Sequence, residues 1–358
     1  MMNRIYQIYG RDAHEMTLRL LEASDAISRL PAGSSVALKP NLVVEGSAEG
    51  GATTHAGVVS GAIEYFHDHG VKDISVIEGS WVGADTARAV RAAGYDAVCR
   101  RYGVPFHDLK RDRTRPVDTP IGKIDICCRA LDAGLLVDLP VLKGHCQTAM
   151  TCALKNLKGC LPDREKRRFH ALGLMKPIAA LGAALKPRLI VVDSICGDLN
   201  FEEGGTPVET NRMYLGTDAV QVDAYGARLM GLRLDEVPYI ELAEAYGAGH
   251  AAFDEGDVVN LNEPSDVKAY PKPSGTVARL TKHVRQDRAC SACFANLTRA
   301  LYASGRDTEI CIGQGFQGKT FDGIGIGRCC SGATHCVMGC PPTAEQIINA
   351  LEDIAYNG

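Results

Sequence analysis

Hydrophobic and polar residues alternate along the chain in two patterns: short apolar runs and longer stretches with helical spacing. Residues 35–39 form an apolar run typical of a buried strand, and residues 57–69 have the spacing of an amphipathic helix. A second apolar run covers residues 73–78. The first part of the chain is therefore predicted to fold in the order strand, helix, strand.

The same alternation continues to about residue 246. Further helices are predicted over residues 86–93, 148–157, 218–230 and 238–246, and further strands over residues 104–109, 133–142 and 188–193. Strands that alternate with helices form mostly parallel sheets covered on both faces. We therefore predict an α/β fold with a mostly parallel sheet flanked by helices, plus a small C-terminal cysteine-rich module.

The predicted boundary between these two parts lies in a segment rich in turn-forming residues. Residues 262–264 and 270–275 contain prolines and a glycine, and a dense cysteine pattern begins soon after them. We predict an α/β domain over residues 1–280 and a cysteine-rich module over residues 281–358.

Seven of the fourteen cysteines fall within the last sixty-nine residues. Cys290 and Cys293 form a CxxC pair, which places two thiolates on one tight turn where both can bind one metal. Cys340 precedes two prolines, which stop the chain from continuing in the same direction after its last ligand. Cys329 follows a glycine-rich stretch. These four residues are the strongest candidates for metal ligands.

Two kinds of metal suit such thiolates, and spacing alone does not separate them. Glycines before Cys329 let backbone N–H groups approach inorganic sulfide, which favours an iron–sulfur cluster. A zinc ribbon usually has two CxxC knuckles, and this tail has only one. Zinc remains the alternative, and free buried thiols are a third possibility. Cys311, Cys330 and Cys336 are spare sulfurs in each case.

Overall charge and hydrophobicity argue against some classes of binding partner, namely nucleic acid and membrane. The formal charge of −4 argues against nucleic-acid binding driven by bulk electrostatics. The sequence has no run of eighteen apolar residues and no basic start followed by an apolar signal region. We expect a cytoplasmic protein that binds neither nucleic acid nor membrane, in which cysteines are metal ligands or free thiols rather than disulfides.

The most unusual polar segment follows the apolar run that ends at residue 142. Lys143 and His145 come where ligands bind in open α/β sheets, outside the carboxyl ends of the strands. On the predicted helix 148–157 and its continuation, Thr151, Lys155 and Lys158 are spaced to share one face. Ammonium groups on one face repel unless an anion lies between them. We predict a site for a small anionic ligand, with Lys143 and His145 as catalytic groups and His145 carrying protons. The alternative is a solvated basic face.

A second set of polar residues follows the first predicted strand. Lys39 and Asn41 stand at its carboxyl end, and His55 opens the next predicted helix after a glycine-rich loop. We predict that Lys39 and Asn41 bind the same ligand or cofactor and that His55 is a further proton-transfer group. The glycine spacing matches no strict phosphate-binding fingerprint, so it does not indicate a nucleotide.

Three segments carry a resemblance to a known family. These are residues 36–41, residues 142–159 with the motifs Lys143-Gly-His145 and Ala153-Leu-Lys-Asn156, and residues 216–224. They resemble the uncharacterised domain-of-unknown-function family numbered 362, and the tail from Gly327 to Pro342 resembles its subgroup with an appended cluster module. The resemblance implies an α/β domain and a [4Fe–4S] cluster on Cys290, Cys293, Cys329 and Cys340. The neighbouring Cys330 and the additional Cys311 and Cys336 depart from the family pattern.

Three functions are consistent with these features. The first is a redox enzyme whose cluster exchanges electrons with a small anionic substrate or cofactor, and it predicts a cluster close to the lysine site. The second is an electron carrier or scaffold that docks on a redox protein partner through the basic residues 164–168. The third is a binding protein in which zinc or a cluster only stabilises the tail. We favour the first.

Overall fold

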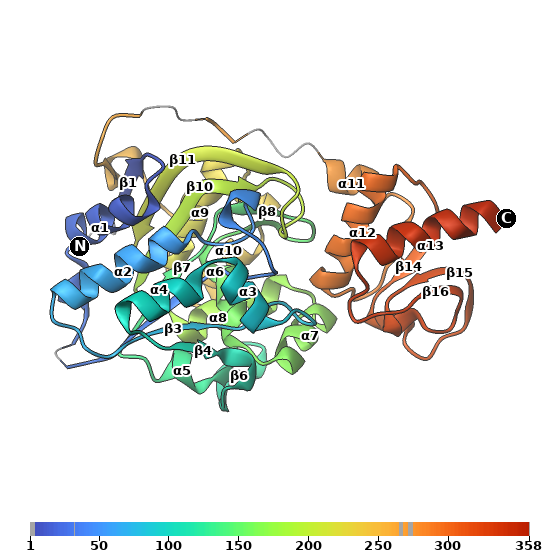
Figure 1. Ribbon diagram of the computed structural model, residues 1–358, viewed down its shortest axis with the longest axis horizontal. Coiled ribbons are helices and arrows are strands. Elements are labelled where there is room, and N and C mark those ends of the chain that lie inside the picture. Colours follow the sequence, from blue (N-terminus) through green and yellow to red (C-terminus); the bar gives the residue numbers. More distant parts are fainter. Residues whose placement is uncertain (1–3, 32, 265–267, 271–274, 358) are drawn as a thin grey trace.

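The computed structural model describes residues 4–31, 33–264, 268–270 and 275–357. Its largest element is an eight-stranded sheet in the order β12, β1, β11, β10, β7, β2, β3, β4 (Figure 1). The strands are β12 (Val258–Asn260), β1 (Ile5–Tyr9), β11 (Pro207–Gly216), β10 (Leu189–Asp198), β7 (Leu135–Leu139), β2 (Val36–Pro40), β3 (Ile74–Glu78) and β4 (Phe106–Asp108). Only β11 runs antiparallel to its neighbours. The predicted α/β fold with a mostly parallel sheet is confirmed.

Helices cover both faces of this sheet (Figure 1). They are α1 (Ala13–Ala23), α2 (Ala56–Asp68), α3 (Thr86–Ala92), α4 (Tyr95–Tyr102), α5 (Cys128–Leu131), α6 (Ala153–Asn156), α7 (Asp163–Ala171), α8 (Met175–Leu185), α9 (Ala219–Leu229) and α10 (Tyr239–Ala245). Two small hairpins, β5 (Thr114–Thr119) with β6 (Gly122–Cys127) and β8 (Lys143–His145) with β9 (Ala149–Thr151), complete this part.

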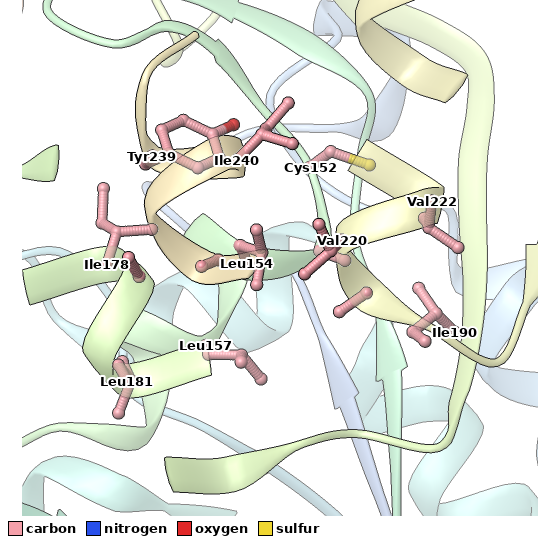
Figure 2. Packing of buried hydrophobic residues seen from close by; sticks show 14 of the residues in the cluster. Cys152, Leu154, Leu157, Ile178, Leu181, Ile190, Val220, Val222, Tyr239 and Ile240 are labelled. Carbon is pink, nitrogen blue, oxygen red and sulfur yellow. The ribbon is translucent and has the colours of Figure 1, made fainter. Parts of the chain in front are cut away.

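The sheet separates two hydrophobic cores because successive side chains of a strand point to opposite faces. Val36 and Leu38 of β2 pack with α1, α2 and α4, whereas Ala37 between them packs on the other face with α6, α8, α9 and α10. Figure 2 shows part of this second core, where Leu154 and Leu157 lie near residues of α8 and α10. These two leucines anchor the short helical segment that carries the predicted lysines.

The C-terminal elements have a hydrophobic core of their own and lie at one end of the molecule (Figure 1). Three helices, α11 (Thr276–Leu280), α12 (Ser291–Ser304) and α13 (Ala344–Asn357), accompany a parallel sheet of β13 (Val284–Gln286), β14 (Ile310–Ile312), β15 (Phe321–Ile326) and β16 (Ala333–Val337). Val277 and Leu280 of α11 pack against this core. The division after residue 280 stays a prediction.

The helix predicted over residues 148–157 is wrong in its first half. Residues 149–151 form β9, which pairs with β8, and α6 begins only at Ala153. The backbone N–H groups of Ala153 and Leu154 donate to the carboxylate of Asp223 on α9, at 2.7 and 3.2 Å. A capping group seventy residues further along the chain thus sets where the helix starts, and local sequence does not reveal it.

Two further features complete the fold. β1 and β11, which were not predicted, extend the sheet with antiparallel pairing, and β10 is longer than the predicted run because it continues to Asp198. Among the described residues, none of the helices combines the length and the apolar character needed to cross a membrane.

Candidate functional site

A cavity of about 70 Å³ lies between the carboxyl ends of the central strands and the start of α12. Asn41 follows β2, and Glu78 is the last residue of β3. Cys290 and Ser291 of the C-terminal elements close the opposite side. We call this space the interdomain cavity. Parallel strands present their carboxyl ends at one edge of a sheet, where ligands bind in α/β folds.

The predicted ligand-binding residues differ in how they relate to this cavity. Asn41, Thr151, Lys155 and Lys158 line it. Thr151 lies on β9, Lys155 on α6, and Lys158 on a 3₁₀ turn (Leu157–Cys160), so the predicted single helical face does not exist. The three side chains meet because the backbone folds sharply between them.

Lys39 belongs to the wall behind the cavity. Its ammonium group lies 2.5 Å from Glu78 Oε2, and neither side chain is more than 3% exposed. Glu78 Oε1 also accepts a hydrogen bond of 2.7 Å from the backbone of Gly79. The lysine therefore balances the buried carboxylate of a lining residue and is not itself among the described residues that line the cavity.

A second buried cluster centres on Glu202, which also lines the cavity. Glu202 forms a short ion pair with Lys155, and its Oε2 lies 2.7 Å from His145 Nε2. Lys143 donates to the backbone carbonyls of Ala52 and Glu202, at 2.6 and 2.9 Å. Burial opposes the charge of Glu202, but His145 and Lys155 hold the pKa of its carboxyl well below the usual range.

His145 and Lys143 thus support the cavity from behind rather than face it. His145 Nδ1 accepts hydrogen bonds from the backbone of Gln147 and Thr148, at 2.9 and 3.1 Å, so its proton lies on Nε2. Burial lowers the pKa of His145 to about 4 and that of Lys143 to about 8. The imidazole is therefore uncharged at neutral pH.

His55 lies elsewhere. It precedes α2 as the N-cap residue, and both its backbone N–H and its ring Nδ1 lie 2.7 Å from Asp193 Oδ2. Burial opposes its charge, but Asp193 raises the pKa of the ring. The structure does not bring His55 to the residues that line the interdomain cavity.

Two further residues that line the cavity, Lys166 and His170, were not predicted as site residues. Both lie on α7. Lys166 Nζ donates to the carbonyls of Gly79 and Ser80, at 2.8 and 2.9 Å. His170 Nε2 lies 3.3 Å from Lys158 Nζ. Their spacing at i and i+4 on an otherwise charged stretch is a signal that they share a face, but it does not say what that face meets.

The basic residues 164–168 do not act together as one surface patch. Arg164 and Arg168 make hydrogen bonds to Asp125 and Glu165, both at 2.9 Å. Lys166 is buried at the cavity, and Arg167 lines a second space next to the cysteines.

That second space, the cysteine cavity, measures about 210 Å³. The four cysteines that were predicted as ligands all line it: Cys290, Cys293, Cys329 and Cys340. Cys290 is the N-cap of α12, so Cys293 falls in the first turn of that helix. The spare cysteines Cys311, Cys330 and Cys336 do not belong to its described lining.

The cysteine thiols influence one another electrostatically. Burial, followed by the neighbouring thiols of Cys329 and Cys340, raises the pKa of Cys290 to about 11. Burial and Cys290 raise the pKa of Cys293 further. All fourteen cysteines are free thiols. In the part of the chain that the structure describes, no group of three or more histidine, cysteine, aspartate or glutamate side chains is placed so that it could hold a metal ion.

The two cavities share a wall. Cys290, Ala292 and Val82 line both of them, so one cysteine faces the other three thiols and also borders the lysine site. Gly83 next to Val82 packs closely on the end of the cysteine loop, because a Cβ there would lie 2.4 Å from Pro341 Cδ. The two halves of the molecule are therefore in direct contact at this point.

The chain is similar to known proteins over part of its length. It is 25% identical over 228 residues to a thylakoid-associated protein of Synechocystis sp.. This match covers 62% of this chain and 70% of that protein. The structure of the lactate racemase apoprotein from Thermoanaerobacterium thermosaccharolyticum matches with a TM-score of 0.43 and 14% identity, over 63% of this chain and 56% of that one. The model of the family described as domain of unknown function (DUF362) matches residues 36–228, and the chain belongs to that family.

Proposed function

We propose that the protein is an iron–sulfur redox enzyme that acts on a small anionic substrate. In this proposal Cys290, Cys293, Cys329 and Cys340 hold a [4Fe–4S] cluster, and the substrate binds in the interdomain cavity. The observation that carries the proposal is the wall that both cavities share through Cys290. A group bound to Cys290 lies next to whatever the lysines bind.

The donor set and the size of the cysteine cavity support the proposal of a cluster. Four thiols are the usual ligands of a [4Fe–4S] cluster. They line a space of about 210 Å³, and four irons with four sulfides need more room than one zinc ion, whose sulfur ligands stand only about 2.3 Å from the metal.

When bound, the cluster supplies or accepts single electrons. The protein's own residues bind and orient the substrate. Lys155 and Lys158 attract an anion, while Glu202 fixes the position of Lys155 through their buried ion pair. The half-buried Trp81 forms part of the same lining, which restricts access of water.

We infer that electrons are exchanged with a protein partner on the side where Cys340 is exposed. Arg167 and Arg328 line the cysteine cavity, and no carboxylate is among its described lining. This local positive charge, on a chain whose formal charge is −4, favours an acidic redox partner.

The test is the iron and acid-labile sulfide content of protein purified without oxygen, with an EPR spectrum before and after dithionite. We expect about four iron and four sulfide per chain and a signal that appears on reduction. Cys293→Ser should lose most of the iron, whereas Cys99→Ser, at a buried cysteine of α4, should keep it. One zinc without sulfide, or unchanged iron in Cys293→Ser, would contradict the proposal.

A further inference from the structure

We propose that the interdomain cavity selects a small carboxylate that also carries a hydrogen-bond donor, such as a hydroxyl or N–H group, close to the carboxylate. This inference rests on the proposed function, since it names the substrate class for the same cavity. It comes from buried polar atoms of the lining that lack a hydrogen-bond partner among the described residues.

Asn41 offers an acceptor to the ligand. Asn156 Nδ2 donates to Asp138 Oδ1 at 2.8 Å and to the backbone carbonyl of Lys39 at 3.4 Å, which fixes the orientation of the Asn156 amide. Asn156 Oδ1 then accepts from Asn41 Nδ2 at 2.9 Å. Asn41 Oδ1 is buried and has no partner among the described residues. A ligand must donate to satisfy it.

Lys158 and His170 offer donors. His170 Nε2 accepts hydrogen bonds from Lys158 Nζ at 3.3 Å and from the backbone N–H of Ser291 at 3.5 Å. Because Nε2 is the acceptor, the neutral ring carries its proton on Nδ1. This Nδ1 is buried and lacks a partner in the described part of the chain. Lys158 makes no ion pair with any described carboxylate. Both groups suit the oxygens of an anion.

Thr151 adds a hydroxyl to this set. Its residue is 1% exposed, and its Oγ1 has no hydrogen-bond partner within the described ranges. Leaving buried polar atoms unpaired destabilises the protein, and a complementary ligand recovers part of that loss. Unpaired atoms on three separate elements, β9, α7 and the loop after β2, therefore indicate one binding site.

Charge and size restrict the ligand further. Lys39 balances Glu78, Lys155 pairs with Glu202, and Lys166 lies 4.0 Å from Asp163. Among the described residues that line the cavity, Lys158 is therefore the lysine left for a ligand with a single carboxylate. The volume of about 70 Å³ admits only a few heavy atoms, because one water already needs roughly 10–15 Å³ on the same measure. A nucleotide does not fit.

Three small acids test the selection on the cluster-loaded protein. Glycolate has a carboxylate and a hydroxyl, methoxyacetate replaces the hydroxyl by an ether without a donor, and acetate lacks the oxygen. We expect glycolate to bind about tenfold more tightly than either, the value of one hydrogen bond, measured by titration calorimetry. Trp81, the chain's one tryptophan, lines the cavity, so its emission should change on binding.

Two variants test the donor group and the carboxylate of the ligand one at a time. Asn41→Ala should remove the preference for glycolate while all three acids still bind, whereas a merely steric preference would persist in this variant. Lys158→Ala should weaken all three acids about tenfold or more. Lys176→Ala, at an exposed lysine of α8, is the matched control and should change nothing.

The outcomes distinguish this inference from the proposed function. Equal affinities of wild-type protein for glycolate and acetate, or a preference that survives in Asn41→Ala, would overturn the inference even if the cluster is present and reducible. Conversely, if protein purified without oxygen contains no iron but still binds glycolate selectively, the inference is supported and the redox function is refuted. The comparison of ligands on wild-type protein needs no variant, so a folding defect in Asn41→Ala leaves a decisive result.

Discussion

Replacing Glu202 by Gln tests whether the buried charges around the cavity act as one electrostatic unit. Glu202 is 5% exposed, and so is its partner Lys155. The substitution keeps the shape of the side chain but removes the negative charge. Lys155 then loses its carboxylate partner in a buried position, next to Lys158 and near Lys143.

The expected loss of stability follows from this burial. Removing one partner of a buried ion pair costs about 3–5 kcal/mol, because the remaining charge is uncompensated. Gln can still accept one hydrogen bond from Lys155, so we expect about 3 kcal/mol for Glu202→Gln. By contrast, Asp235 is 66% exposed and pairs with Arg233 at 3.0 Å in solvent, so Asp235→Asn should leave the midpoint of urea unfolding nearly unchanged.

Urea unfolding of both variants, followed by circular dichroism and Trp81 emission, measures the difference. The pKa of Glu202 is held well below its usual range in the folded state, so its contribution is fully present above the unfolded pKa. The loss should therefore be the same at pH 7 and pH 6, and the two proteins should approach each other only as pH falls through the folded pKa. A cost below about 1 kcal/mol at pH 7 would refute the reasoning.

Two further predictions concern the cavity and the contact between the two halves. Burial, followed by Lys155, lowers the pKa of Lys158 to about 7, so glycolate affinity should be full below that pH and fall above it. Lys158→Arg keeps the charge, so the fall in glycolate affinity should be abolished in calorimetric titrations of this variant from pH 6 to 9. If the affinity of the variant falls as that of the wild-type protein does, Lys158 is excluded as the cause. Gly83→Ala places a Cβ 2.4 Å from Pro341 Cδ at a φ of +90°, and should cost about 2–4 kcal/mol in urea unfolding. Gly103→Ala, at φ +66° with open space around it, should cost only about 1 kcal/mol, and equal costs would show that the contact with Pro341 is unimportant.

Much of the fold could be predicted from periodicity. β2, α2, β3 and α3 lie within one or two residues of their predicted ranges, because each has a continuous apolar pattern and local start or stop residues. The helix over residues 148–157 failed because Asp223, remote in sequence, caps its shortened form. β11 was missed because a strand that pairs antiparallel inside a parallel sheet follows no helix and so breaks the alternation.

The candidate site was predictable only in part. Lys155, Lys158 and Thr151 stood out by their spacing, but they line one cavity for a reason other than the helical face that suggested them. The i, i+4 spacing of Lys166 and His170 did not single them out as site residues, because a charged stretch is usually a solvated surface. Lys143 and His145 were conspicuous in sequence, yet they hold the loop around Glu202 from behind.

The sequence by itself determined the residue types that bear chemistry: thiols with metal-ligand spacing in the tail, and lysines where buried strands end. Spacing and composition are local properties, so they can be read along the chain. Only the tertiary structure decided that Cys290 borders both cavities and that polar atoms of Asn41, Thr151 and His170 have no partner among the described residues. Such contacts join segments separated by more than a hundred residues, and the packing of the two halves, not any local pattern, brings them together.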